Sequence, residues 1–117
     1  MKSFIGSVVA TVVMAVSNGA LATEMPELTK KHDCDICHEI DKKLVGPAWK
    51  DVSKKYNGAT KYVYKGKEYP LVEGLVMAVS QGTSGNWGDM PMPANDPYGT
   101  KQTDMQGLVR FILYQAN

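Results

Sequence analysis

Two cysteines and a histidine stand together in the pentapeptide Cys34-Asp35-Ile36-Cys37-His38. The pattern Cys-x-x-Cys-His is the attachment signature of a c-type haem. One helical turn would place both sulfur atoms along one edge of the porphyrin, where each thiol adds to a vinyl group and becomes a thioether. His38 would then direct a ring nitrogen at the iron. We therefore predict one haem c, attached covalently through Cys34 and Cys37, with His38 as a metal ligand.

Other roles for the two cysteines agree less well with the sequence. A disulfide across two intervening residues would close a very small loop and add little stability. A thioredoxin-like redox pair normally accompanies a βαβ pattern, and the sequence shows none. A zinc site would need further ligands, and the only histidines are His32 and His38. His32 lies on the same side of the attachment turn as His38, so we interpret it as a surface histidine.

The second axial position of the iron decides between an electron carrier and a protein that binds small molecules. A thioether there would close the site and raise the reduction potential, because soft sulfur favours ferrous iron. The methionines that follow residue 22 are Met25, Met77, Met90, Met92 and Met105. Met77 and Met105 lie on stretches of helical periodicity, where core packing explains them.

Met90 and Met92 lie in a segment rich in glycine, proline and asparagine. Prolines on both sides of Met92 restrict its backbone, and that stiffness would help to hold a weak ligand on iron. Composition alone therefore favours Met92 over Met90 without excluding Met90.

The chain around these residues has mainly helical patterns. Helices are expected over residues 27–33, 48–56 and 71–80, and from a capping box at Thr103 and Gln106 to near the C-terminus. Gly82 is the expected end of the third helix. Residues 59–69 are interpreted as an irregular excursion or a small hairpin, and no strand pattern is strong enough to predict a sheet. The expected fold class is all-α.

The first 22 residues resemble a secretory signal peptide. Lys2 supplies a positive start, residues 4–16 form an apolar run, and residues 20–22 read Ala-Leu-Ala, a cleavage site of the A-x-A type. We expect cleavage before Thr23, export to the periplasm and a mature domain over residues 23–117. The alternative is an uncleaved membrane anchor, although the apolar run is short for a span of about 20 residues.

The charge balance excludes one class of partner. Removal of Lys2 would leave 12 of the 13 basic residues against 12 acidic residues. A neutral chain gives no electrostatic support for nucleic-acid binding. We expect protein partners, no nucleic acid and no stable membrane insertion after cleavage.

Three segments in order resemble the cytochrome c551/c552 family of small bacterial class I cytochromes c. They are the pentapeptide at residues 34–38, the sequence KLVGPAWKDV at residues 43–52 and the sequence GTSGNWGDMPMP at residues 82–93. The resemblance covers nearly all of the chain after residue 22. It implies the small class I cytochrome c fold, with about four helices wrapped round one covalently attached haem.

The resemblance also implies roles for particular residues. His38 and Met92 would be the axial ligands, and the Pro47 carbonyl would accept a hydrogen bond from the other ring nitrogen of His38. Trp87 would donate its indole N–H to a haem propionate. Asn95 would orient the methionine sulfur.

We therefore expect a soluble periplasmic monohaem cytochrome c, a monomer and not an enzyme. It would carry single electrons between respiratory redox partners, through brief contacts with donor and acceptor proteins. Ala78 departs from the family, because some members carry an arginine there beside the propionates. Two alternatives are a haem subunit of a dehydrogenase or oxidase complex, and a ligand-binding haem protein with a displaceable sixth ligand.

Overall fold

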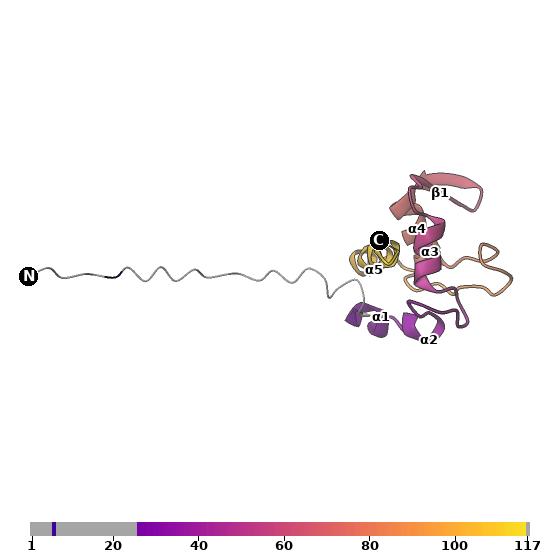
Figure 1. Cartoon of the computed structure of the whole chain (residues 1–117). Coiled ribbons are helices and arrows are strands. Elements are labelled where there is room, and N and C mark those ends of the chain that lie inside the picture. The colour runs from indigo at the N-terminus through magenta and orange to yellow at the C-terminus, as the bar shows by residue number, and fades with distance from the viewer. Residues whose placement is uncertain (1–5, 7–25, 117) are drawn as a thin grey trace, which may run out of the picture.

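The computed structural model describes Gly6 and residues 26–116. The expected signal peptide, Gly6 apart, and the cleavage before Thr23 lie outside the described residues. The elements are α1 (Glu27–Lys31), α2 (Cys34–Cys37), α3 (Trp49–Lys55), β1 (Lys61–Tyr64), β2 (Lys67–Pro70), α4 (Leu71–Gln81) and α5 (Gln102–Tyr114) (Figure 1). The fold is mainly helical, as predicted. Among the described residues, no helix has both the length and the apolar character that crossing a membrane requires.

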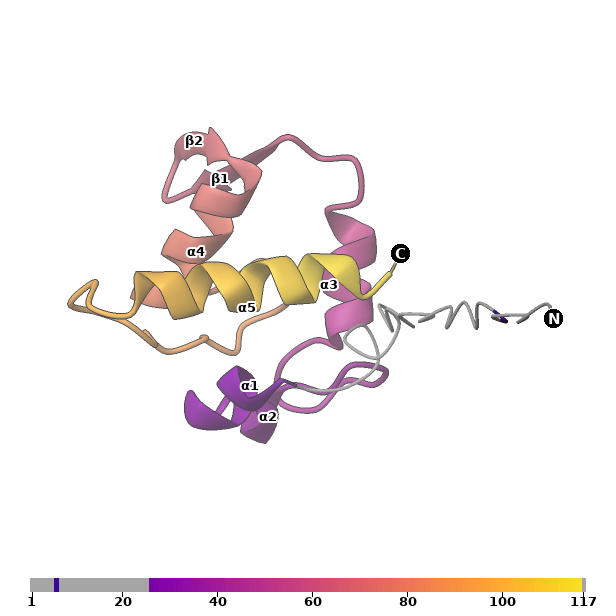
Figure 2. The same ribbon diagram turned by 90° about the vertical axis from the view of Figure 1, so that its left-hand side faces the viewer.

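The two longest helices, α4 and α5, pack together at the centre of the core. Figure 2 shows α5 running between α4 with the hairpin on one side and α1 with α2 on the other. The buried apolar side chains of this cluster are Tyr62 and Tyr64 of β1, Leu75, Val76 and Ala78 of α4, and Met105, Leu108 and Val109 of α5. The helical spacing of these positions in α4 and α5 is what turns one face of each helix towards the other.

Helix α3 packs on α5 through aromatic rings. Trp49, which is 2% exposed, meets Phe111 edge to face, with ring centroids 5.8 Å apart and an interplanar angle of 85°. The helix begins two residues after Pro47, and Gly58 follows it with a φ of 76°. Both ends agree with the expected helix over residues 48–56, since proline suits a helix start and glycine tolerates a positive φ.

The hairpin considered for residues 59–69 is present, so a small sheet does form. Strands β1 and β2 are antiparallel, with Tyr64 opposite Lys67. Lys65 and Gly66 connect them with φ values of 49° and 78°, which is the backbone of a tight two-residue hairpin turn. The strands have only four residues each, which is why the alternating pattern was too short to predict a sheet.

The expected helix over residues 27–33 is interrupted. Helix α1 ends at Lys31, and Asp33 has a left-handed φ of 57° before α2 begins. The interpretation of His32 as a surface residue is wrong. Its side chain is 5% exposed, and its Nε2 lies 3.0 Å from Oδ2 of Asp104 in the first turn of α5. The two residues are 72 positions apart, so local sequence gives no sign of the pair.

The predicted capping box of the last helix is also wrong. Helix α5 begins at Gln102, and the side chain of its N-cap residue, Lys101, makes no capping hydrogen bond. The carboxylate of Asp96 instead accepts hydrogen bonds from the backbone N–H groups of Thr100 and Lys101, both at 3.0 Å, and from the side-chain amide of Gln102 at 2.7 Å. These hydrogen bonds lower the pKa of the Asp96 carboxyl, that from Gln102 most strongly. An acid in the preceding loop, outside the helix, thus organises the helix start.

Candidate functional site

The two cysteines begin and end the single turn of α2. Both are partly buried. Burial, followed by the nearby charge of Asp35, raises the pKa of Cys34 to about 11. The spacing therefore places both sulfur atoms on one helical turn, with no disulfide between them. The backbone N–H of His38 donates to the Cys34 carbonyl at 2.9 Å, which ties the histidine to the same turn.

The imidazole of His38 is held in one orientation. Its ring stacks on Trp49 with centroids 5.5 Å apart, and its Nδ1 lies 2.8 Å from the Pro47 carbonyl oxygen. That contact is the one the family resemblance implies, and it assigns the proton to Nδ1 and the lone pair to Nε2. Burial lowers the pKa of His38, against the opposing effect of the Pro47 hydrogen bond. A neutral imidazole is the form that binds a metal ion.

Gly46 packs closely against the His38 ring. The sequence alone had assigned this glycine no role. A Cβ at Gly46 would lie 2.5 Å from Cε1 of His38 and 2.9 Å from its Nδ1. The backbone N–H of Gly46 also donates to the Cys37 carbonyl at 2.8 Å. The Gly-Pro pair therefore combines a close approach to the ring with the carbonyl that orients it. The available signal was the position of this pair in the second segment that resembles the family.

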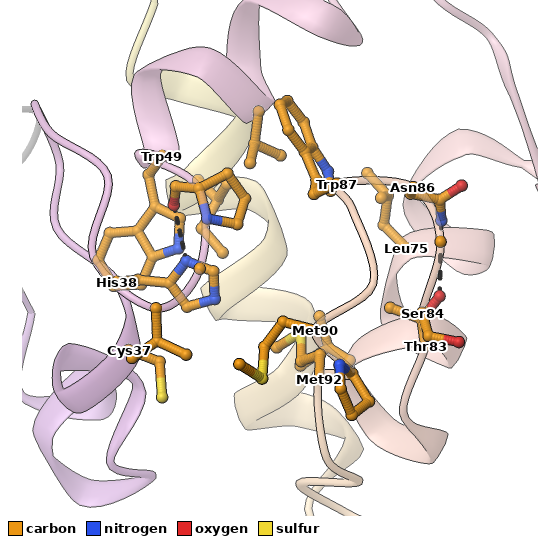
Figure 3. Close-up of a pocket in the computed structure, with 18 of the residues that line it drawn as sticks. Cys37, His38, Trp49, Leu75, Thr83, Ser84, Asn86, Trp87, Met90 and Met92 are labelled. Carbon is orange, nitrogen blue, oxygen red and sulfur yellow. Dashed lines mark hydrogen bonds between the residues drawn. The ribbon is translucent and has the colours of Figure 1, made fainter.

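Met92 has a fixed backbone. Its N–H donates to the Thr83 carbonyl at 2.8 Å, and its own carbonyl accepts from the Thr83 N–H at 3.1 Å. This isolated antiparallel bridge ties the beginning of the loop that follows α4 to the middle of that loop. Met90 has no such bridge among the described residues and is 65% exposed. Both methionines line the cavity described below (Figure 3).

Asn95 ties the same loop to α4. Its side-chain nitrogen donates to the carbonyls of Val79 and Pro93, each at 3.1 Å. Its backbone N–H also donates to the Val79 carbonyl. The hydrogen bonds of the described residues include none from Asn95 to the sulfur of Met92.

Trp87 lies on the cavity wall with a cation beside it. The indole is 39% exposed, and the Lys55 Nζ lies 4.6 Å from the ring centroid. The same ammonium group donates to the Asn86 carbonyl at 3.1 Å. A cation over the face of an indole is attracted by the ring quadrupole. Lys55 therefore fixes both the ring and the neighbouring peptide.

Most of these residues line one cavity of about 140 Å³, which opens to solvent. Of the predicted site residues, Cys37, His38, Pro47, Trp87 and Met92 line it, whereas Cys34 and Asn95 do not. None of its described lining residues is Asp, Glu, Lys or Arg. A mainly apolar wall is usual for a cofactor site.

The cavity fits a haem in three respects. Figure 3 shows His38 and Met92 on opposing parts of the wall, with Cys37 below the imidazole. The Nε2 of His38 makes no hydrogen bond to any described residue, so its lone pair is available to a metal. The apolar wall suits a porphyrin body. The described residues contain no group of three or more His, Cys, Asp or Glu side chains that could hold a metal ion by themselves.

Comparisons with known proteins agree on one family. No family model matches the chain. The chain is 37% identical over 100 residues to cytochrome c-551 of Allochromatium vinosum, covering 86% of this chain and 93% of that protein. It is 33% identical over 113 residues to cytochrome c-552 of Hydrogenobacter thermophilus, covering 97% of each. The crystal structure of wild-type Nitrosomonas europaea cytochrome c552 matches with a TM-score of 0.61 at 33% identity, over 74% of this chain and 94% of that one.

Proposed function

The chain belongs to the cytochrome c551/c552 family, and from this premise we propose that it is a periplasmic carrier whose haem iron is bound by His38 and Met92. Membership makes the protein a small monohaem electron carrier of the class I fold. Its haem c is covalently bound, and Cys34 and Cys37 are the cysteines of the attachment motif. The ligand pair, the compartment and the partners are what the proposal adds.

The oriented lone pair of His38 supports its role as one ligand. The Pro47 carbonyl holds the Nδ1 proton, and the stacked Trp49 ring prevents rotation. A hydrogen bond at the far nitrogen makes an imidazole a better donor. His38 therefore needs no rearrangement to bind iron.

The backbone bridge between Met92 and Thr83 is the single observation that carries the choice of the second ligand. A thioether is a weak ligand, so a fixed backbone reduces the entropy lost when sulfur binds. Asn95 strengthens the same loop through Val79 and Pro93. We assign it the role of holding the methionine segment in place.

Two filled axial positions suit electron transfer. The haem supplies the ferric/ferrous couple, and a thioether ligand raises its reduction potential. His38 and Met92 would occupy both axial sites, so that water or a small molecule would reach the iron only by displacing one of them. The protein therefore carries one electron without making or breaking a bond, and it is not an enzyme.

Some family members carry an arginine at the position of Ala78, and we propose that Lys55 supplies the positive charge in its place. Ala78 is 3% exposed within the core. The Lys55 ammonium lies over Trp87 instead. We assign the indole N–H of Trp87 to a haem propionate, with Lys55 as the nearby positive charge.

Partner contact is proposed at the apolar rim of the cavity. Val45 and Met90 line the cavity and are 52% and 65% exposed. Small exposed apolar areas suit the brief contacts of redox proteins. Export through a cleaved signal peptide would deliver a monomer, residues 23–117, to periplasmic donors and acceptors.

Absorption spectroscopy of the purified protein tests the proposal. A ferric haem with a thioether ligand has a weak far-red band, and the ferrous form with both axial sites filled should bind carbon monoxide slowly. We expect the band and slow binding. Rapid carbon monoxide binding without the band would favour a ligand-binding haem protein instead. Intact mass should equal residues 23–117 plus one haem, and co-purification with a larger enzyme would favour a permanent haem subunit.

A further inference from the structure

The hairpin formed by β1 and β2 packs two tyrosines against the rest of the protein. Tyr62 and Tyr64 are each 6% exposed, whereas Val63 between them is 60% exposed. Alternate residues of a strand point to opposite faces, so both phenol rings enter the interior from the same face of β1. Their hydroxyl groups lie near the loop that follows α4.

The Tyr64 hydroxyl holds the beginning of that loop. It donates to the Gly82 carbonyl at 2.8 Å. Gly82 ends α4 with a φ of 89°, and a Cβ there would lie only 2.9 Å from the Met92 carbonyl oxygen. The next residue, Thr83, makes both hydrogen bonds of the bridge to Met92. The Tyr64 hydroxyl thus binds the residue next to Thr83, which forms the bridge to Met92.

The Tyr62 hydroxyl holds the loop at a second point. It accepts a hydrogen bond from the Asn86 side-chain nitrogen at 2.8 Å. The ring itself has little freedom, because it packs edge to face on Tyr56 with centroids 5.5 Å apart. On another side, a Cβ at Gly74 of α4 would lie 2.8 Å from the Tyr62 Cβ.

We propose that Tyr64 and Tyr62 are positioning residues, which brace residues 82–86 so that the Thr83–Met92 bridge keeps the Met92 side chain in the cavity. This inference rests on the proposed binding of iron by Met92. It assigns the hairpin a function in holding the sixth ligand. Without the Tyr64 hydroxyl, the Gly82 carbonyl would lose its buried donor, and the loop would open more easily.

Competition by imidazole measures how firmly Met92 is held. Imidazole added to the ferric protein should displace the thioether, and loss of the far-red band reports the displacement. One hydrogen bond contributes about 0.5–1.5 kcal/mol. We therefore expect Tyr64→Phe to raise the apparent affinity for imidazole about 2–12-fold, and Tyr62→Phe to raise it in the same direction.

Tyr69→Phe is the matched control. Tyr69 lies on β2 of the same hairpin, and its hydroxyl makes no hydrogen bond to any described residue. This variant should retain the wild-type affinity for imidazole. Urea unfolding of all three variants separates a general loss of stability from a specific loosening of the ligand.

The outcomes are distinct. A lower urea midpoint for Tyr64→Phe with wild-type imidazole affinity would overturn the proposal, because the phenol would then only stabilise the fold. If Tyr64→Phe does not fold, wild-type affinity in Tyr62→Phe would also overturn it. Absence of the far-red band from the wild-type protein would remove the proposed Met92 ligand, and this inference with it. The wild-type spectrum therefore distinguishes failure of the ligation from failure of the brace.

Discussion

Gly46 and His38 are in such close contact that no larger residue fits at position 46. A Cβ there would lie 2.5 Å from Cε1 of the imidazole and 3.0 Å from its Nε2. The ring cannot retreat, because Trp49 stacks on it and the Pro47 carbonyl holds its Nδ1. The smallest side chain would therefore disturb the orientation of the histidine.

Gly46→Ala should destabilise the folded ferric protein by about 1–3 kcal/mol, as overpacking usually does. Urea unfolding followed by circular dichroism measures the loss. Gly107→Ala is the control, because a Cβ in that position of α5 would make an ordinary contact of 3.5 Å with Leu28 Cδ1. Alanine in a helix interior should stabilise the protein by about 0.5–1 kcal/mol relative to glycine. Equal effects of the two substitutions would contradict the close contact.

Met105 is expected to be a core residue and not a ligand of the iron. It is fully buried between α4 and α5. Met105→Ala should cost about 2–5 kcal/mol of unfolding free energy, through lost burial and the cavity that remains. The far-red band of the ferric protein should persist in the folded variant. Loss of the band without loss of stability would mean that Met105 is a ligand and not a core residue.

Asp104 should make stability depend on pH. The hydrogen bond from His32, followed by that from Lys31, lowers the pKa of this carboxyl below its ordinary value of 3.8. A lowered folded-state pKa stabilises the protein fully above the unfolded-state value, and this contribution is lost as the pH falls through the folded-state value. Asp104→Asn should therefore be less stable than wild type at neutral pH, and the difference should shrink in acid below 3.8.

Urea midpoints at neutral and acid pH measure this difference. Asp41→Asn is the control, because Asp41 is 74% exposed and pairs only with Lys50 among the described residues. Exposed pairs contribute roughly 0–1 kcal/mol, so this variant should change little at either pH. A gap between Asp104→Asn and wild type that stays constant with pH would contradict the assignment of the titration to Asp104.

The sequence predicted the features that depend on neighbouring residues. Helical periodicity located α3, α4 and α5 within a few residues of their observed bounds. The spacing of Cys34 and Cys37 identified the attachment turn. The Gly-Pro pair at residues 46–47 came from a matching segment, and the structure supplied the close contact that explains the glycine.

Most of the features that the sequence did not predict depend on partners distant in the chain. His32 is buried by Asp104, 72 residues away. Asp96 is the exception: its carboxylate accepts from the backbone N–H groups of Thr100 and Lys101 just before α5, in place of the expected capping box. Tyr64 lies 18 residues before the carbonyl that it binds. Local patterns contain no information about the contacts of His32 and Tyr64, since these depend on how the helices and the hairpin pack together.

Two alanine variants decide whether Met92 or Met90 is the sixth ligand. Ferric absorption spectra and reduction potentials of Met92→Ala and Met90→Ala should be recorded beside those of the wild type. Met92→Ala should lose the far-red band and have a lower potential, because the sulfur ligand favours ferrous iron. Met90→Ala should keep the band and a potential near that of the wild type. Loss of the band in Met90→Ala and its retention in Met92→Ala would contradict the assignment of the sixth ligand.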